Sequence, residues 1–386
     1  MSKLEEYIPY AKTDRQLEIL QTVISEGSNR KAAKKLGVAL GTVSNTMIKI
    51  KAYAASKGVS PDHGLNKPAP EGFLVSTLRV DKDGNYIPAF AKASSKDQIS
   101  EMFDYIREEV KSLKKAKITK PAKDTEKDLL NLYTFADVHL GLLSWASETG
   151  TDWDLNIGYE LVKQSFNDMI RRSPKSSECM ISLLGDFLHT DGLIPVTPMS
   201  GNILDTDTRY PKLVAKSYKL ILELINMALQ YHDKVIVLCA EGNHDQSSAT
   251  WIQAVLPPHY EDEPRVEILT HPAPYYAYEW GTNMLCFHHG HKLHKPNDLR
   301  QKFSSDPQFR PVWGRTKYCY IHTGHRHYEC TSENGAKVIQ HPTICGRSAY
   351  EVRAGYMSER ACMAYTYHKD YGEHSYVVVR PEMFEE

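Results

Sequence analysis

The chain has 386 residues, of which 41% are hydrophobic and 25% are charged, as in an ordinary globular protein. This composition excludes a chain that is disordered throughout, a collagen-like repeat and a disulfide scaffold. The length predicts two or three domains at about 150 residues each. We find neither an apolar run of the ~18 residues that a membrane helix needs nor an apolar signal-peptide core. We therefore expect a cytoplasmic protein with no membrane partner.

Charge and histidine are distributed unevenly along the chain. Residues 1–60 hold 10 Lys and Arg against 5 Asp and Glu, a net charge of +5, whereas residues 129–386 have a net charge of −7. All but one of the 17 His follow residue 128. The basic front favours contact with a polyanion, and the His-rich body favours a metal site. The seven Cys form no CxxC pair and are expected to be reduced.

The front of the chain is predicted to be helical. Apolar spacing predicts helices over 14–26, 29–36 and 40–53, with Asn29 as a cap and Gly37 as a stop. A Pro- and Gly-rich linker follows, then two β-rich runs around Asp83 and Gly84 that indicate a hairpin. Residues 96–116 indicate a charged helix, and 117–128 a polar tether. We therefore expect a helical domain at 1–60, a linker at 61–128 and a catalytic domain at 129–386.

The segment 30–51 has the pattern of a helix-turn-helix. Ala33 is small where two helices would cross, Gly37 would make the turn, and Val38 and Val43 would fill the core. This pattern resembles the helix-turn-helix of DNA-binding regulators and site-specific recombinases. DNA contacts are expected from Arg30, Lys31, Lys34, Lys35, Thr42, Ser44, Asn45 and Lys49. The alternative is a helical domain that has no ligand or binds a protein; the basic charge favours nucleic acid.

From residue 129 onward, short apolar runs alternate with helical segments, which is typical of an α/β domain. Polar residues follow five of these runs: Asp137-Val138-His139, Gly185-Asp186-Phe187-Leu188-His189, Gly242-Asn243-His244-Asp245, His288-His289-Gly290-His291 and Gly324-His325-Arg326-His327. Each segment alone is compatible with an ordinary turn. Five in succession, all offering oxygen or imidazole and no thiolate, predict a site for Mn²⁺, Fe, Zn²⁺ or Mg²⁺. In an extended segment, residues two apart point to the same side and can reach one cluster.

These five segments, in this order, resemble the calcineurin-like metallophosphoesterase family over about residues 129–345. The resemblance implies a four-layer αββα sandwich with two divalent metal ions, Mn²⁺ being our first choice, and hydrolysis of a phosphoester by metal-activated water. It implies metal ligands at Asp137, His139 and His327 for the first ion, Asn243, His289 and His325 for the second, and Asp186 as the bridge. It also implies that His244 protonates the leaving oxygen and that Asp245 orients His244.

The second segment reads Gly-Asp-x-x-His, whereas many phosphoprotein phosphatases have Asp in the last position. The resemblance is therefore closer to the phosphodiesterase and nuclease branch. Roles for several neighbouring residues stay open. His288 is expected in the core, His291 and His294 could line the phosphate site or cap a turn, and Arg209 and Arg326 could contact phosphate. Core or loop packing is the more frequent use of Trp145, Trp153 and Trp313, although any of them could stack on a base.

A DNA-binding front tethered to a two-metal phosphoesterase predicts a DNA-directed phosphodiesterase, either a nuclease or a DNA end-processing enzyme. One alternative is a phosphomonoesterase or a small- or cyclic-nucleotide phosphodiesterase recruited to DNA. Another is a non-catalytic DNA-binding regulator, which the complete ligand set disfavours. The combination suits a bacterial or phage-infected cell.

Overall fold

The computed structural model describes residues 3–63, 65–69, 73–80, 86–92, 124–198 and 200–385. The chain divides into two compact units. The N-terminal unit comprises Met1–Phe103 and Thr190–Tyr210, and the sandwich unit comprises Asp104–His189 and Pro211–Glu386. This grouping differs from our linear division, because the sequence analysis placed 190–210 inside the catalytic domain. The expected turn at Asp83-Gly84 and the expected charged helix at 96–116 lie outside the described residues.

The N-terminal unit begins with four helical elements: η1 (Glu5–Tyr10), α1 (Asp14–Glu26), α2 (Asn29–Leu36) and α3 (Leu40–Ser56). Gly27 and Gly37 end α1 and α2 in the left-handed conformation, with φ of 69° and 65°. Ser28, and not Asn29 as we expected, caps α2: its hydroxyl accepts from the backbone N of Lys31 at 3.3 Å. The helices enclose a core that includes Leu20, Ala33, Val43, Met47 and Ile50.

Two short strand pairs complete the N-terminal unit: β1 (Val59–Ser60) with β2 (Leu65–Asn66), and β3 (Phe73–Val80) with β4 (Tyr86–Lys92). The antiparallel pairing of β3 and β4 confirms the predicted hairpin. The segment 190–210 packs here as well. Its Ile203 contacts a small cluster of Leu65 and Val75, and a Cβ added to Gly201 would lie 3.4 Å from Ala52 on α3.

The sandwich unit contains two sheets. The six-stranded sheet has the order β15-β14-β5-β6-β7-β8 and the five-stranded sheet the order β12-β13-β11-β10-β9. The strands of the first are β5 (Glu126–Phe135), β6 (Ser176–Leu184), β7 (Lys234–Ala240), β8 (Val266–Leu269), β14 (Cys362–His368) and β15 (Gly372–Val379). Those of the second are β9 (Tyr276–Trp280), β10 (Asn283–Phe287), β11 (Tyr318–Thr323), β12 (Cys330–Asn334) and β13 (Ala336–Gln340).

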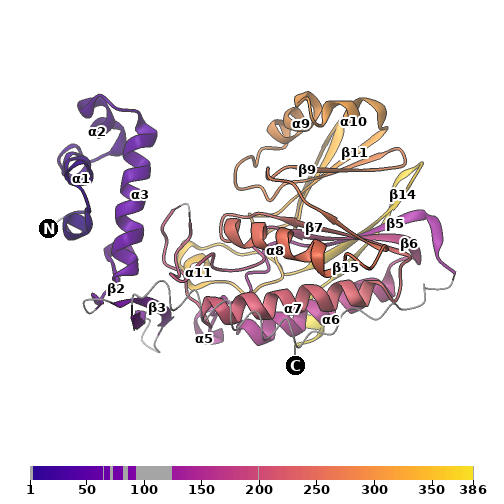
Figure 1. Ribbon diagram of the computed structural model, residues 1–386, viewed down its shortest axis with the longest axis horizontal. Coiled ribbons are helices and arrows are strands. Elements are labelled where there is room, and N and C mark those ends of the chain that lie inside the picture. Colours follow the sequence, from indigo (N-terminus) through magenta and orange to yellow (C-terminus); the bar gives the residue numbers. More distant parts are fainter. Residues whose placement is uncertain are drawn as a thin grey trace. The chain divides into compact units, whose positions relative to one another are not determined.

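Helices cover the outer face of each sheet (Figure 1). On the six-stranded sheet lie α6 (Leu155–Arg172) and α7 (Tyr210–Ala228), and on the five-stranded sheet lie α9 (Pro296–Ser305) and α10 (Arg310–Arg315). Among the described residues, the sandwich unit also contains α5 (Ala146–Thr149), α8 (Gln246–His259), α11 (Ala349–Ala354) and η3 (Pro381–Met383). The short helix η2 (Pro61–His63) belongs to the N-terminal unit. The predicted four-layer αββα sandwich, with a helical part before it, is confirmed.

The period of two in the strands explains this layering. On β5, Leu130 and Leu132 point into the core between the two sheets, where they meet side chains such as Phe287 of β10. The residues between them point the other way. Tyr133 and Phe135 both pack on Phe166 of α6, with ring centroids 5.1 and 5.8 Å apart. Because both faces of β5 are buried, the strand reads as a nearly continuous apolar run.

The parallel strands determine where the functional residues lie. Strands β5, β6 and β7 are mutually parallel, as are β10, β11 and β13 in the other sheet. The carboxyl ends of parallel neighbours share one edge of a sheet, so the loops that follow β5, β6, β7, β10 and β11 meet there. None of the helices in the described part of the chain combines the length and apolar character that crossing a bilayer requires.

Candidate metal centre

The strand-end loops bring the predicted ligands into two groups. Ligand atoms of Asp137, His139 and His327 all lie within 4.8 Å of one another, and so do those of Asp186, His289 and His325. No cysteine belongs to either group. Neither group contains Asn243, which the resemblance implies for the second ion; the six residues that they do contain are all implied ligands, and that they bind metal stays a prediction. The donors match cations that accept oxygen and imidazole.

Short distances join the two groups. Within the groups, His327 Nε2 lies 3.3 Å from Asp137 Oδ1, and His289 Nε2 lies 3.2 Å from Asp186 Oδ2. Between them, His289 Nε2 lies 3.8 Å from Asp137 Oδ1, and His139 Nε2 lies 3.9 Å from Asp186 Oδ2. Asp186 therefore faces ligands of both groups, which is the placement that a bridging carboxylate needs.

Several buried polar atoms at this place have no hydrogen-bond partner in the structure: Asp137 Oδ1, Asn243 Oδ1 and His289 Nε2. A buried polar atom without a partner costs about 1–3 kcal/mol, so such atoms are rare in folded proteins. All three atoms belong to predicted ligands, and two of them, His289 Nε2 and Asp137 Oδ1, lie 3.8 Å apart. The residues present therefore fit a pair of divalent cations.

Second partners fix which nitrogen of each ring faces the centre. His289 Nδ1 donates to the carbonyl oxygen of Leu184 at 2.8 Å, which leaves Nε2 for a cation. His327 Nδ1 donates to Glu351 Oε1 at 2.6 Å, which again leaves Nε2. Such outer partners orient a ligating imidazole and raise its basicity.

The carboxylates and imidazoles of the two groups shift one another's pKa values. Burial alone would lower the pKa of His289, but the carboxylates of Asp186 and Asp137 outweigh it and raise this pKa to about 9. Burial would also lower the pKa of His327, but the carboxylates of Asp137 and Glu351 raise it well above its usual value. Burial would raise the pKa of Asp186, yet the nearby imidazoles hold it well below its usual range. Cations that bind here must therefore displace protons.

The backbone of the site is strained. Among the described residues other than glycine, six have positive φ, and five of these are predicted ligands: Asp137 (52°), His139 (47°), Asp186 (49°), His325 (73°) and His327 (61°). Left-handed backbone at residues other than glycine is uncommon and concentrates at functional sites. The loops therefore adopt this conformation to aim their side chains at one point.

Two glycines of the motifs make room for ligands. A Cβ at Gly242 would collide with the carboxylate and backbone N of Asp186, and a Cβ at Gly185 would lie 2.5 Å from His289 Nδ1. Any side chain at either position would push a ligand out of place. This explains sterically why glycine precedes the ligand in both the Gly-Asp and Gly-Asn segments.

Asp245 does not have the contacts that we expected. Its carboxylate accepts hydrogen bonds from the backbone N of Asp186, Phe187 and Leu188, at 3.2, 2.7 and 3.1 Å, and from that of Gly242 at 2.8 Å. Burial and the charge of Asp186 raise the pKa of Asp245 to about 7. The residue thus holds the bridging loop in shape, because those amides have no strand to pair with.

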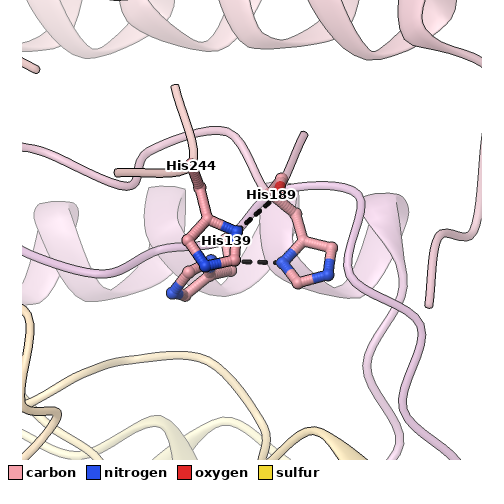
Figure 2. Close-up of side chains that lie close together, drawn as sticks. All are labelled: His139, His189 and His244. Carbon is pink, nitrogen blue, oxygen red and sulfur yellow. Dashed lines mark hydrogen bonds between the residues drawn. The ribbon is translucent and has the colours of Figure 1, made fainter. Parts of the chain in front are cut away.

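The orientation of His244 comes from a different group, the backbone of His189. His244 Nδ1 donates to the carbonyl oxygen of His189 at 2.8 Å, and the two rings stack with centroids 5.2 Å apart (Figure 2). His244 is half-buried, so its Nε2 remains for a substrate. Its backbone N donates to Asp186 Oδ1 at 2.8 Å, which fixes its position relative to the predicted bridge.

His189 was missed as a site residue, although its segment was recognised. Its Nδ1 lies 3.2 Å from His139 Nδ1, and His139, His189 and His244 form a third close group (Figure 2). One of the two Nδ1 atoms must donate and the other accept. If His139 offers Nε2 to a cation, its Nδ1 carries the proton and His189 accepts it. His189 Nε2 is buried and has no hydrogen-bond partner among the described residues.

Glu351 was also missed. It lies on α11, where Ser348 and Glu351 form a capping box: Glu351 Oε2 accepts from the Ser348 backbone N and hydroxyl at 2.7 and 2.8 Å. The other carboxylate oxygen holds His327. Burial opposes ionisation, but the bond to His327 lowers the pKa of Glu351 to about 2. A Ser-x-x-Glu pattern predicts such a helix start, but not that it would contact a ligand.

The histidines and the arginine whose roles the sequence left open lie in different environments. His288 is buried, stacks on Tyr275 at 4.5 Å and accepts from the Gly290 backbone N at 2.9 Å, as expected for a core residue. Both ring nitrogens of His291 are buried and have no hydrogen-bond partner among the described residues, and burial and His289 lower its pKa to about 3. His294 and Arg326 are exposed.

The three tryptophans and Arg209 fall into different environments. Trp153 is fully buried, Trp313 packs on the cluster beneath α9, and Trp145 is exposed. Arg209 is an exposed residue of the N-terminal unit.

The predicted DNA contacts lie on α2 and α3. All but one are exposed: Arg30, Lys31, Lys34, Lys35, Thr42, Asn45 and Lys49. The exception is the half-buried Ser44, whose hydroxyl accepts from Asn29 Nδ2 at 3.5 Å. Lys35 also pairs with Glu26 at 2.6 Å. That these residues contact DNA stays a prediction.

Comparisons with known proteins give only distant likenesses. The sequence matches no protein-family model and no curated protein. Among solved structures, Vps29 with zinc from Entamoeba histolytica is similar over 65% of this chain and 99% of its own, at 10% identity and a TM-score of 0.26. A dimetal phosphatase from Danio rerio is similar over 65% and 98%, at 9% identity and 0.36. A purple acid phosphatase from yellow lupin, Lupinus luteus, is similar over 78% and 58%, at 10% identity and 0.33. At these TM-scores the likenesses support no inference about chemistry.

The contact between Glu351 and His327 gives a prediction about metal affinity. Glu351→Gln keeps the size of the side chain but removes the charge that orients His327, so Mn²⁺ affinity should fall about 10- to 100-fold. Titration calorimetry of the metal-free chain measures this loss. Glu148→Gln is the matched control. Glu148 lies on α5 and pairs at 3.2 Å with Arg353, which lies on α11 as Glu351 does, and Glu148 touches no predicted ligand. Equal affinities for the two variants would contradict the role of Glu351.

Proposed function

We propose that the chain is a metal-dependent phosphodiesterase that acts on DNA, as a nuclease or a DNA end-processing enzyme. One observation carries the proposal. Carboxylate and imidazole donors from five strand-end loops lie in close groups, and three buried atoms of predicted ligands have no hydrogen-bond partner among the described residues. A folded protein retains such a cluster at a cost in stability, which indicates selection for chemistry.

The donor set decides which cations fit. Oxygen and imidazole ligands accept Mn²⁺, Fe, Zn²⁺ or Mg²⁺, and we propose two ions with Mn²⁺ as the first choice. Asp137, His139 and His327 would hold one ion, Asn243, His289 and His325 the other, and Asp186 both. Bound there, the pair would supply Lewis acidity toward a phosphate group. The chain's own residues set the spacing, because the strained loops and the bridging-loop bonds of Asp245 fix the carboxylates.

His244 is the residue that we propose for proton transfer. Its ring is held through Nδ1 by the carbonyl of His189, so it cannot rotate freely, and Nε2 is left for the reacting phosphate. With Nδ1–H held by the carbonyl, a ring that is also protonated at Nε2 is an imidazolium; it can pass the Nε2 proton to the leaving oxygen and become neutral imidazole. Because the ring is only half-buried, a new proton can reach it from solvent.

The choice between diester and monoester substrates is directly testable. With Mn²⁺, the chain should hydrolyse bis(p-nitrophenyl) phosphate with a higher kcat/KM than p-nitrophenyl phosphate, and chelation should abolish both. Release of p-nitrophenol is the measurement. A preference for the monoester would favour a phosphomonoesterase, and loss of both activities in the Mn²⁺-loaded chain would favour a non-catalytic regulator.

Replacement of His244 tests its role as an acid. His244→Ala should bind Mn²⁺ normally and lower kcat on DNA by about 10²- to 10⁴-fold, the usual range for general acid catalysis. The loss should be smaller with bis(p-nitrophenyl) phosphate, because p-nitrophenolate leaves without a proton. Steady-state kinetics on both substrates measure the difference. Equal losses on the two would rule out the acid role.

The N-terminal unit supports the choice of DNA as the substrate. On α3, Thr42, Asn45 and Lys49 are exposed, and their spacing of three and four residues places them on one face of the helix. Arg30, Lys31 and Lys34 are exposed on α2 and carry positive charge. A helix that offers polar side chains beside a basic helix suits contact with bases and phosphates.

Deletion of residues 1–128 would test DNA binding poorly, since the same unit includes 190–210 and its Ile203 packs on Leu65 and Val75. Two exposed lysines are a cleaner target. Lys31→Gln with Lys34→Gln should weaken duplex binding and reduce the slope of log affinity against log salt by about 2, because each phosphate contact releases roughly 0.9 counterion. Fluorescence anisotropy with a duplex measures both.

The matched control for these lysines removes the same charge from the sandwich unit. Lys127→Gln with Lys175→Gln changes two exposed residues at the amino ends of β5 and β6, away from the strand-end loops. This control should keep the salt slope of the unchanged chain. A slope that falls equally in both double variants would leave the N-terminal unit without a specific role in binding.

The net charge of residues 129–386 favours an alternative to DNA as the substrate. Residues 129–386 have a net charge of −7, and an acidic surface repels DNA. This favours the second candidate, a phosphomonoesterase or a small- or cyclic-nucleotide phosphodiesterase that the N-terminal unit recruits to DNA.

A further inference from the structure

Exposed aromatic and apolar side chains gather beside the metal centre. They come from three segments of the sandwich unit and are called the aromatic rim here: Trp145 (45% exposed), Tyr328 (43%), Tyr350 (63%), Tyr356 (59%) and Met357 (84%). Single exposed rings are common on protein surfaces, but a group of them marks a binding surface.

Residues of the aromatic rim are sequence neighbours of a predicted ligand, His327, and of its hydrogen-bond partner, Glu351. Tyr328 follows His327 in the sequence, and Tyr350 precedes Glu351, whose carboxylate accepts from His327 at 2.6 Å. Tyr356 is held by its backbone N, which donates to the carbonyl of Glu351 at 2.9 Å, and its ring lies 6.4 Å from that of Tyr350.

Trp145 belongs to the same surface because α5 contacts α11. Arg353 of α11 pairs with Glu148 of α5 at 3.2 Å. Arg347, just before α11, donates to the carbonyl of Thr149 at 2.8 Å. Trp145 is the residue before α5, and its own carbonyl accepts from the Thr149 backbone N at 2.9 Å. Trp145, Tyr350 and Tyr356 therefore lie on or next to two short helices that contact each other.

Charge beside the rim suits a polyanion. Arg326 lies between the predicted ligands His325 and His327, is exposed, and donates from Nη1 to the Tyr328 hydroxyl at 3.4 Å. Of the acids near the rim, Glu148 and Glu351 are engaged by Arg353 and His327, and Glu329, which follows Tyr328, is exposed. A phosphate drawn to the centre would therefore have a guanidinium and flat rings on this side.

We propose that the aromatic rim is a stacking platform for the unpaired bases of a single-stranded nucleic acid whose phosphodiester reaches the metal centre. The proposal rests on the proposed function. Bases in a duplex are covered by their neighbours, whereas an unpaired base has free faces that stack on exposed rings. Stacking accepts any base, so the platform selects single strands and not a sequence.

The test compares flat and branched side chains at Tyr350. A thymidine tetranucleotide, which is too short to form a duplex, should inhibit turnover of bis(p-nitrophenyl) phosphate by the Mn²⁺-loaded full chain. Tyr350→Phe keeps the ring and should hold the inhibition constant within about twofold. Tyr350→Leu keeps an apolar side chain without a flat face, and should raise the inhibition constant about 5- to 150-fold.

Two controls separate stacking from other effects. Tyr371→Leu should keep the unchanged chain's inhibition constant, because Tyr371 is exposed and stacks on His368 at the turn beside the amino end of β5. A tetranucleotide that lacks its bases should inhibit weakly, and equally in every variant. Equal inhibition constants for the Leu and Phe variants, or equal inhibition by the two tetranucleotides, would overturn the platform.

Other occupants give different results. If Tyr350→Leu changes the sedimentation of the chain and not the inhibition constant, the rim is an interface between two copies, and the proposal is wrong. If bis(p-nitrophenyl) phosphate is not turned over at all, the proposed function fails. Binding of the same tetranucleotides to the Mn²⁺-loaded variants by fluorescence anisotropy then decides the platform separately.

Discussion

Two buried carboxylates, Asp137 and Asp186, set the constraint on which the candidate metal centre depends. They lie at the ends of neighbouring parallel strands, where burial makes unbalanced negative charge costly. In the absence of a cation, His289 and His327 keep protons at raised pKa values to balance that charge. Divalent ions would replace those protons. The opposite charges of the carboxylates and imidazoles thus offset one another at the centre.

The surrounding structure keeps these groups in place despite their cost. Strands with both faces buried carry the loops, and the loops pass through positive φ at the residues that aim the ligands. Asp245 accepts bonds from the amides of the bridging loop, while Leu184 and Glu351 orient the imidazoles. Removal of one of these supports would loosen ligands and leave the fold intact, so metal affinity and catalytic rate are the quantities to measure.

Much of this could be predicted from sequence because the information is local. Each ligand directly follows an apolar run, and parallel strands bring such positions to one edge; the α1, α2 and hairpin predictions likewise rest on caps, glycines and periodicity. Contacts between distant segments could not be predicted in this way. Glu351 reaches His327 from a later helix, and the carbonyl of His189 holds His244 where Asp245 was expected to act. The association of 190–210 with the N-terminal unit depends on Ile203 meeting Leu65 and Val75, which no motif signals.

The central claim is that the strand-end donors bind two cations. Anomalous diffraction at the manganese edge, from crystals of the full chain grown with Mn²⁺, tests it most directly. The structure predicts two peaks about 3.5–4 Å apart. One should lie against Asp137, His139 and His327 and the other against His289, His325 and Asn243, with Asp186 contacting both. A single peak, or peaks that do not touch Asp186, would contradict the dinuclear centre.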